Sequence, residues 1–206
     1  MQPGDGTAER TFIENARRAQ IIDAAIDTLA EVGYARASLG RIAERIGISR
    51  ALISYHFAGK EELFTEIVRG VLEQSRAYMG PRVMAETSGP AMLHAYIESN
   101  LVFIREHRNA LIAIVEIART RVAAETPPLL ANHNPDQAVQ VLAQLLSRFQ
   151  EAGDFRADFD PRLMAITIRA AIDTVAPRLA RDPDFDIDEY RQQIATVFQL
   201  ATRVDE

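Results

Sequence analysis

Hydroxyl and basic side chains between residues 38 and 60 have the types and spacing needed to bind a polyanion. One face of a predicted short helix carries four side chains of suitable size: Arg50, Ala51, Ser54 and Tyr55. A helix of this kind enters the major groove of DNA and contacts base edges with its N-terminal residues. Ser38 and Lys60 each begin a further predicted helix, where a helix N-terminus and a polar side chain favour a phosphate. The predicted chemistry is therefore recognition of double-stranded DNA.

Two short helices must position these side chains. The predicted helices Leu39–Ile46 and Arg50–His56 are separated by Gly47, which adopts a positive φ easily and turns the chain sharply. Ser38 and Ser49 are good N-caps for them. Four isoleucines are placed to be buried beneath the pair: Ile42, Ile46, Ile48 and Ile53. The spacing is that of a helix-turn-helix, although an ordinary helical hairpin inside a bundle has the same spacing.

The remainder of the chain is predicted to be helical as well. After a flexible tail at 1–9, apolar residues follow helical spacing from about Thr11 to Val32, and Gly33 ends that helix. A connecting helix from Lys60 to about Met79 leads into a Gly- and Pro-rich linker at 80–90. Further helices are predicted at 91–106, 109–121, 136–152, 162–179 and from Asp186 or Asp188 onward, with Asp160 capping the one that Pro161 begins.

These elements predict an all-α protein of about nine helices in two domains. Residues 1–60 form the tail and a three-helix DNA-binding domain. Residues 61–206 form a helical ligand-binding and dimerisation domain, which the connecting helix at about 60–79 enters.

Composition and charge limit the class of protein. The chain has 206 residues, 48% of them apolar, and no Cys, so no disulfide framework or thiolate site exists. The N-terminus lacks the pattern of a signal peptide, and no apolar run is long enough to cross a bilayer, so a cytoplasmic protein without membrane contact is expected. The net charge is −6, but residues 1–60 carry eight basic and seven acidic side chains. The acidic charge therefore lies in the body.

Residues 13–64 resemble the N-terminal signature of the TetR family of transcriptional regulators. The resemblance rests on Gly33-Tyr34, Ser38-Leu39, Ile42-Ala43, Gly47-Ile48-Ser49, Tyr55-His56-Phe57, Lys60 and Leu63. It implies a homodimer that binds a pseudo-palindromic operator and is released from it by a small molecule, with no cofactor and no enzymatic activity. The implied phosphate contacts are Ser38, Tyr55, His56 and Lys60, and the implied base contacts are Arg50, Ala51, Leu52 and Ser54.

The sequence departs from the family pattern at three places in the predicted recognition helix. Ala51 stands where Gly is common, Leu52 where a small polar residue is common, and Ser54 where Tyr is common. These departures are expected to change base preference rather than abolish binding. Lys60 is the only Lys beside 22 Arg, and it lies where the family places a compact charge on a phosphate.

The C-terminal body is predicted to supply the dimer interface and the ligand pocket. The helix at 162–179 is apolar nearly all round, Ile172 included, and a helix near the surface needs a second partner to cover so much apolar area. The resemblance likewise implies dimerisation through the last two helices. Pocket candidates are the polar, aromatic and Met side chains on apolar helices: Met92, Tyr96, Asn100, Phe103, Glu116 and Phe149. For each of them a satisfied core or interface group is the more common role, because a buried carboxylate or amide needs only some partner and Met and aromatic side chains more often form core than pocket.

The sequence favours two other classes of protein less. An all-helical enzyme lacks support, since the sequence shows no nucleophile–base pair and no phosphate loop; His94 and Glu98, four residues apart, are expected to be surface groups rather than metal ligands. An interaction protein that has lost DNA binding would not need Tyr55, His56 or Lys60. No metal site is predicted.

Overall fold

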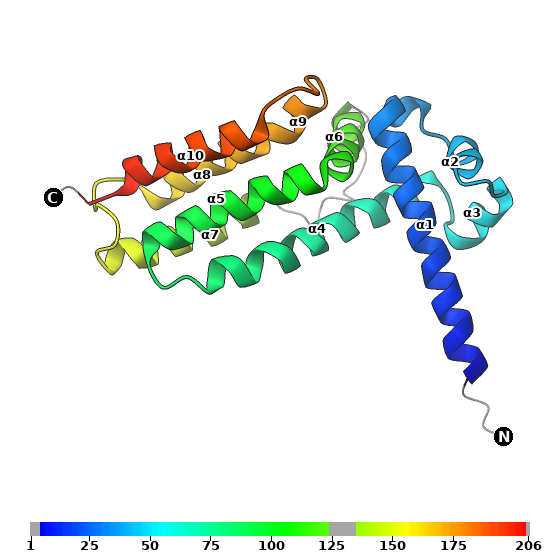
Figure 1. The fold of residues 1–206 in the computed structure, drawn as a ribbon, viewed down its shortest axis with the longest axis horizontal. Helices are drawn as coiled ribbons and strands as arrows, with labels where there is room; N and C mark the ends of the chain where they lie inside the picture. The colour runs from blue at the N-terminus through cyan, green and yellow to red at the C-terminus, as the bar shows by residue number, and fades with distance from the viewer. Residues whose placement is uncertain (1–4, 124–134, 205–206) are drawn as a thin grey trace. The chain divides into compact units, whose positions relative to one another are not determined.

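Every element of the chain that the structure describes is a helix. The computed structural model describes residues 5–123 and 135–204, and Figure 1 shows the ten helices within them. The chain divides into two compact units. Unit 1 comprises Met1–Val71 and Asn109–Glu125, and unit 2 comprises Leu72–Arg108 and Thr126–Glu206. The predicted all-α class is confirmed.

Unit 1 contains three helices in sequence, the first part of a fourth, and a later helix that returns to it. These are α1 (Asp5–Arg36), α2 (Leu39–Arg45), α3 (Arg50–His56), α4 (Lys60–Met84) as far as Val71, and α6 (Arg108–Ala123) from Asn109 onward. The predicted tail at 1–9 is wrong in part, because α1 already begins at Asp5. Adding residues to an existing helix costs far less than starting one, so the amphipathic helix extends into this polar stretch.

Local capping determines where the short helices of unit 1 begin. The Ser38 hydroxyl accepts the Arg41 N–H at 3.2 Å and the Ser49 hydroxyl accepts the Leu52 N–H at 3.1 Å, which confirms both predicted N-caps. Gly47 turns the chain with a φ of 66°. Ile42 and Ile53 are fully buried as predicted, whereas Ile46 and Ile48 are half-buried.

Unit 2 is also helical throughout the part that the structure describes. It contains α4 from Leu72, α5 (Gly89–Glu106), α7 (Pro135–Glu151), α8 (Pro161–Asp173), α9 (Val175–Leu179) and α10 (Ile187–Thr202). Helix α5 contacts α7, α8 and α10, and α7 packs along α8. The buried residues of α5 include Met92, Leu93, Ile97 and Leu101. Asp160 caps α8 with Pro161 in its first turn, as the sequence predicts.

Two differences from the predicted elements involve prolines. Helix α4 was expected to end near Met79, but it runs through Pro81 to Met84 with Val83 buried, so packing of the last turn outweighs the local preference. The single helix predicted over 162–179 is two helices, with a break at Thr174. Pro177 has no N–H, and its ring opposes the carbonyl of Asp173, which explains the break.

Two consecutive residues at the start of α6 are anchored in different units. The Arg108 guanidinium donates to the carbonyl oxygens of Leu179 and Pro183 within unit 2. The Asn109 amide donates to the Asp27 carboxylate on α1, at 2.9 Å, within unit 1. The chain therefore passes from one unit to the other across a single peptide bond.

None of the helices described is long and apolar enough to cross a membrane.

Candidate nucleic-acid interface

Helix α3 presents a polar outward face above a buried one. Ile53 and Phe57 are buried on its inner side. The four side chains predicted to face outward, Arg50, Ala51, Ser54 and Tyr55, are all exposed, and Tyr55 is 73% accessible. Leu52 and His56 are half-buried, and the rings of Tyr55 and His56 meet edge to face at 5.0 Å. The outer surface of α3 is thus free to approach a groove.

A recess of about 460 Å³ brings together three of the predicted DNA-binding residues. Its lining comes from the end of α1 and the starts of α2, α3 and α4, and includes Ser38, Arg50 and Lys60. Two cationic side chains and a hydroxyl beside three helix N-termini suit an anion. The predicted phosphate and base contacts of Ser38, Arg50 and Lys60 thus fall at one place, which the sequence alone did not indicate.

Lys60 is turned inward in this structure. Its ammonium donates to the Tyr34 carbonyl at 2.7 Å and lies 4.0 Å from the centre of the Tyr34 ring. Burial lowers the pKa of Lys60. The side chain therefore joins the end of α1 to the start of α4, a structural role beyond the phosphate contact that the family resemblance implies.

Arg18 is a residue of this region that the sequence analysis missed. Its guanidinium donates to the carbonyl oxygen of His56, the last residue of α3, and lies 4.2 Å from the centre of the Phe57 ring. It also pairs with Glu66 of α4 at 3.9 Å. A cation at the C-terminus of a helix satisfies a carbonyl that has no partner in the helix and stabilises the helix dipole. No local pattern marks Arg18, because its partner on α3 is 38 residues away.

Two of the predicted ligand contacts belong to a polar cluster inside unit 2. Arg169 of α8 donates to the Tyr96 hydroxyl at 3.1 Å and to the Asn100 side-chain oxygen at 3.0 Å. It also pairs with Asp173, and only 18% of its side chain is exposed. Burial raises the pKa of the Tyr96 phenol. Tyr96 and Asn100 were predicted to line the pocket, and Arg169 and Asp173, four residues apart on one helix, are candidates for a structural pair by their spacing; the structure joins all four.

The other predicted ligand contacts are spread over the molecule. Phe103 lies near the end of α5, and the centre of its ring is 4.2 Å from the centre of the His107 ring. Phe149 contacts Phe155, which lies against Gly89 at the opposite end of α5. Phe103 lies fourteen positions after Gly89, a rise of about 21 Å along the helix. Met92 is buried in unit 2 and Glu116 lies in unit 1.

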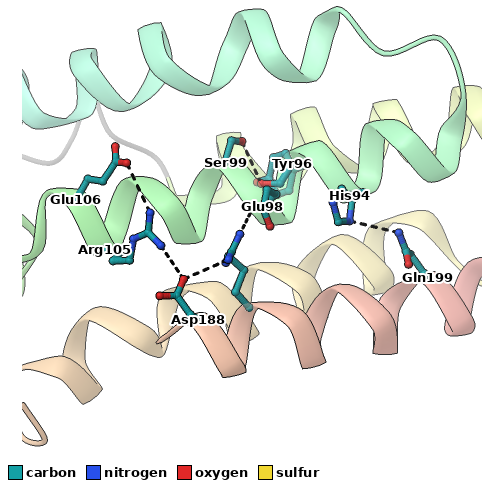
Figure 2. A network of polar contacts seen from close by, with 9 residues as sticks. His94, Tyr96, Glu98, Ser99, Arg105, Glu106, Asp188 and Gln199 are labelled. Carbon is teal, nitrogen blue, oxygen red and sulfur yellow. Dashed lines mark hydrogen bonds and ion pairs between the residues drawn. The ribbon is translucent and has the colours of Figure 1, made fainter. Parts of the chain in front are cut away.

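A row of polar contacts joins α5 to α10 (Figure 2). Glu98 accepts a hydrogen bond from Arg191, and Asp188 accepts from Arg105 at 2.7 Å. His94 lies 3.4 Å from the Gln199 amide. His94 and Glu98 therefore contribute to this row, and no cluster of three metal-ligating side chains occurs among the residues described.

The surfaces of α8 and α10 carry exposed apolar side chains. On α8 these are Leu163, 64% exposed, and Ile166, and on α10 they are Val197 and Leu200. Each pair has the i, i+3 spacing of a single helix face. Ile172, by contrast, is 1% exposed, so its predicted place on this face is wrong. It faces the core because it follows Ile168 at i+4 on the opposite side of α8.

Comparison with known proteins supports the same interpretation of the N-terminal region. Residues 21–67 match the family model described as bacterial regulatory proteins, tetR family. The chain is 34% identical over 99 residues to the HTH-type transcriptional regulator BetI of Cronobacter sakazakii, covering 47% of this chain and 49% of that protein. It spans about half the length of the first curated relatives that it matches.

Solved structures extend the similarity of fold to nearly the whole chain. The ketosteroid transcriptional regulator KstR2 of Mycobacterium tuberculosis matches with a TM-score of 0.76 and 22% identity, covering 92% of this chain and 96% of that one. AibR, solved in complex with isovaleryl coenzyme A and operator DNA, matches with a TM-score of 0.74 and 18% identity, covering 88% and 97%. At these identities the likeness is one of fold.

Proposed function

We propose that this chain, a member of the TetR family of bacterial regulatory proteins, is a ligand-responsive transcriptional regulator that represses by binding operator DNA as a homodimer. The observation that carries the proposal is the exposed face of α3 beside the recess at Ser38, Arg50 and Lys60. The cytoplasm is its proposed location.

In the proposed complex α3 lies in the major groove. Base contacts come from Arg50, Ala51, Leu52 and Ser54, since residues at the start of a recognition helix approach base edges. Phosphate contacts come from Ser38, Tyr55, His56 and Lys60, which flank that helix. Lys60 must exchange the Tyr34 carbonyl for a phosphate oxygen to take part.

The proposed dimer forms through α8 and α10. Leu163, Ile166, Val197 and Leu200 would otherwise leave large apolar side chains in water. An obligate interface of this kind resembles a divided core and buries on the order of 2,000 Å² or more. Helix-turn-helix dimers contact half-sites about 34–36 Å apart, so the operator is proposed to be pseudo-palindromic.

The proposed effector binds in unit 2, next to the helices that surround α5. Met92, Tyr96, Asn100, Phe103 and Phe149 remain the proposed contacts. Tyr96 and Asn100 are the best supported, because they already hold a cationic group, Arg169, in a setting with little access to water. Glu116 was predicted with them, and its place in unit 1 supports a different role, argued below.

The test is to let the full-length protein select duplexes from a random-sequence pool. Enrichment of an inverted repeat, bound with an affinity that falls steeply with salt, is expected. Arg50→Ala should lower affinity for the selected duplex by about 1–3 kcal/mol and relax the preference at one base pair. Failure to enrich any sequence would favour an interaction protein that has the fold without DNA binding. Turnover of a bound ligand would favour an enzyme.

A further inference from the structure

Gly33 interrupts the helical backbone of α1, and the side chain of Glu116 lies against it. Its φ of 74° and ψ of 169° lie in a region that residues with a Cβ rarely adopt. A Cβ added there would lie 3.1 Å from Oε2 of Glu116 on α6. The Glu116 carboxylate therefore lies in close contact with the position that a Cβ of residue 33 would occupy.

The chain leads from Gly33 into α2 through a short, constrained link. The Ala37 N–H donates to the Gly33 carbonyl at 3.1 Å, and Ala37 is fully buried. The next residue, Ser38, caps α2 and lines the recess at the proposed interface. We therefore expect a displacement of Gly33 to reach Ser38 through this hydrogen-bonded and buried turn.

Helix α4 holds the next residue, Tyr34, from another side. The Lys60 ammonium binds the Tyr34 carbonyl at 2.7 Å, and the Tyr34 hydroxyl donates to Glu61 at 2.7 Å. The Tyr34 ring meets that of Phe64 edge to face at 5.4 Å. Gly33 and Tyr34 thus form a corner, held by α4 through Tyr34 and contacted by α6 through Gly33.

The contact of α6 with this corner depends on side chains that reach across. Asn109 donates to Asp27 at the start of α6, and Glu116 meets Gly33 seven residues later. Glu116 is 26% exposed and also pairs with Arg119 of its own helix at 3.3 Å. These two contacts join α6 to α1 at Asp27 and at Gly33.

We propose that Glu116 is a positioning residue for DNA binding: its carboxylate, packed against Gly33, sets the corner from which α2 and the recess at Ser38 begin. This rests on the proposed function, because its readout is operator affinity. In this proposal α6 contacts the DNA-binding helices directly through Glu116, and Glu116 has a role that does not involve touching the effector.

The experiment compares three variants on a duplex selected by the wild-type protein. Glu116→Ala removes the contact and is expected to weaken binding by roughly 5- to 150-fold, the range of typical coupling between sites. Glu116→Gln keeps the size and an oxygen of the side chain, so it is expected to bind within about twofold of wild type. Arg119→Gln is the matched control, since it removes the ion pair of Glu116 and leaves the packing on Gly33 intact. It too should bind like wild type.

Three readouts separate positioning from a general loss of structure. The salt slope of Glu116→Ala should equal that of wild type, because no phosphate contact is lost. Affinity for a scrambled duplex should fall less than affinity for the selected one. Gly33→Ala should weaken selected-duplex binding in the wild-type background and weaken it less when added to Glu116→Ala, since the new Cβ then has no carboxylate to displace.

Several results would overturn the inference. Wild-type affinity of Glu116→Ala would do so, as would an equal loss in Glu116→Gln or in Arg119→Gln. If Glu116→Ala proves unfolded by circular dichroism, Gly33→Ala in the wild-type background decides instead, and unchanged affinity of that variant for the selected duplex would reject the inference. Absence of any selected duplex removes the proposed function and the inference together, whereas the other results remove the inference alone.

Discussion

The two units place polar and apolar side chains in opposite ways. In unit 1 the outer face of α3 is polar, and apolar residues such as Ile53 and Phe57 are buried beneath it. In unit 2 the outer faces of α8 and α10 expose Leu163, Ile166 and Leu200, while Arg169 lies mostly buried among polar partners. The first surface suits a solvated polyanion, and the second suits another apolar surface.

This contrast indicates which of the two surfaces must be covered by a partner for its unit to be stable. A polar surface is stable in water and needs a partner only for function. An exposed apolar face on otherwise buried helices costs free energy until it is covered. Dimerisation is therefore expected to precede DNA binding.

The largest expected effect comes from placing a charge on α8. Ile166→Asp puts a carboxylate on the exposed face, so a dimer would have to bury an unpaired charge at a cost of at least several kcal/mol. A folded monomer is expected by analytical ultracentrifugation. Ile172→Asp is the matched comparison, because Ile172 is buried within the unit and its variant should lose helical circular dichroism instead. A dimeric Ile166→Asp at low micromolar concentration would refute this interface.

A smaller effect is expected where unit 2 packs most tightly. A Cβ on Gly89 would lie 2.8 Å from the Phe155 ring, which is buried and cannot move freely. Gly89→Ala should therefore lower the free energy of unfolding by about 1–3 kcal/mol in urea denaturation. Gly70 lies inside α4 with nothing near an added Cβ, so Gly70→Ala should raise stability by about 0.5–1 kcal/mol. Equal effects of the two variants would contradict the packing at Gly89.

The internal polar cluster is expected to contribute modestly and with a defined pH dependence. Tyr96→Phe removes an acceptor of Arg169 and should cost about 0.5–1.5 kcal/mol at neutral pH. Burial raises the pKa of folded Tyr96 above its unfolded value, so the contribution of this phenol is complete below pH 10 and is lost as pH rises through the folded pKa. The difference between wild type and Tyr96→Phe should therefore shrink above pH 10 in denaturation experiments. A constant difference would mean that Tyr96 does not titrate as a buried group.

The smallest expected effect concerns Lys60 at the polar surface. Lys60→Ala should weaken binding to every duplex and reduce the salt slope by about 1, as expected for one phosphate contact. Fluorescence anisotropy at several salt concentrations measures this slope. An unchanged slope would leave Lys60 with only its role at the Tyr34 carbonyl.

The helix caps and the turn of the candidate DNA-binding region were predictable because each of them acts on neighbouring residues. Ser38, Ser49 and Gly47 act on residues two to four positions away, so their capping and turning roles follow from spacing alone. The exposed face of α3 follows from the periodicity of Ile53 and Phe57. Arg18 was not predictable from the sequence, because its contact with His56 depends on how α1 crosses α3.

The sequence by itself determined the all-α class, the helix-turn-helix and most helix boundaries, since caps, breakers and periodic apolar residues act within one or two turns. Tertiary structure decided that Ile172 is buried while Ile166 is exposed, that Arg169 joins Tyr96 and Asn100, and that Glu116 lies against Gly33. The physical reason is distance along the chain. Arg169 and Tyr96 are 73 residues apart. A contact between residues so far apart in the chain is determined by the packing of whole helices, which no local pattern encodes.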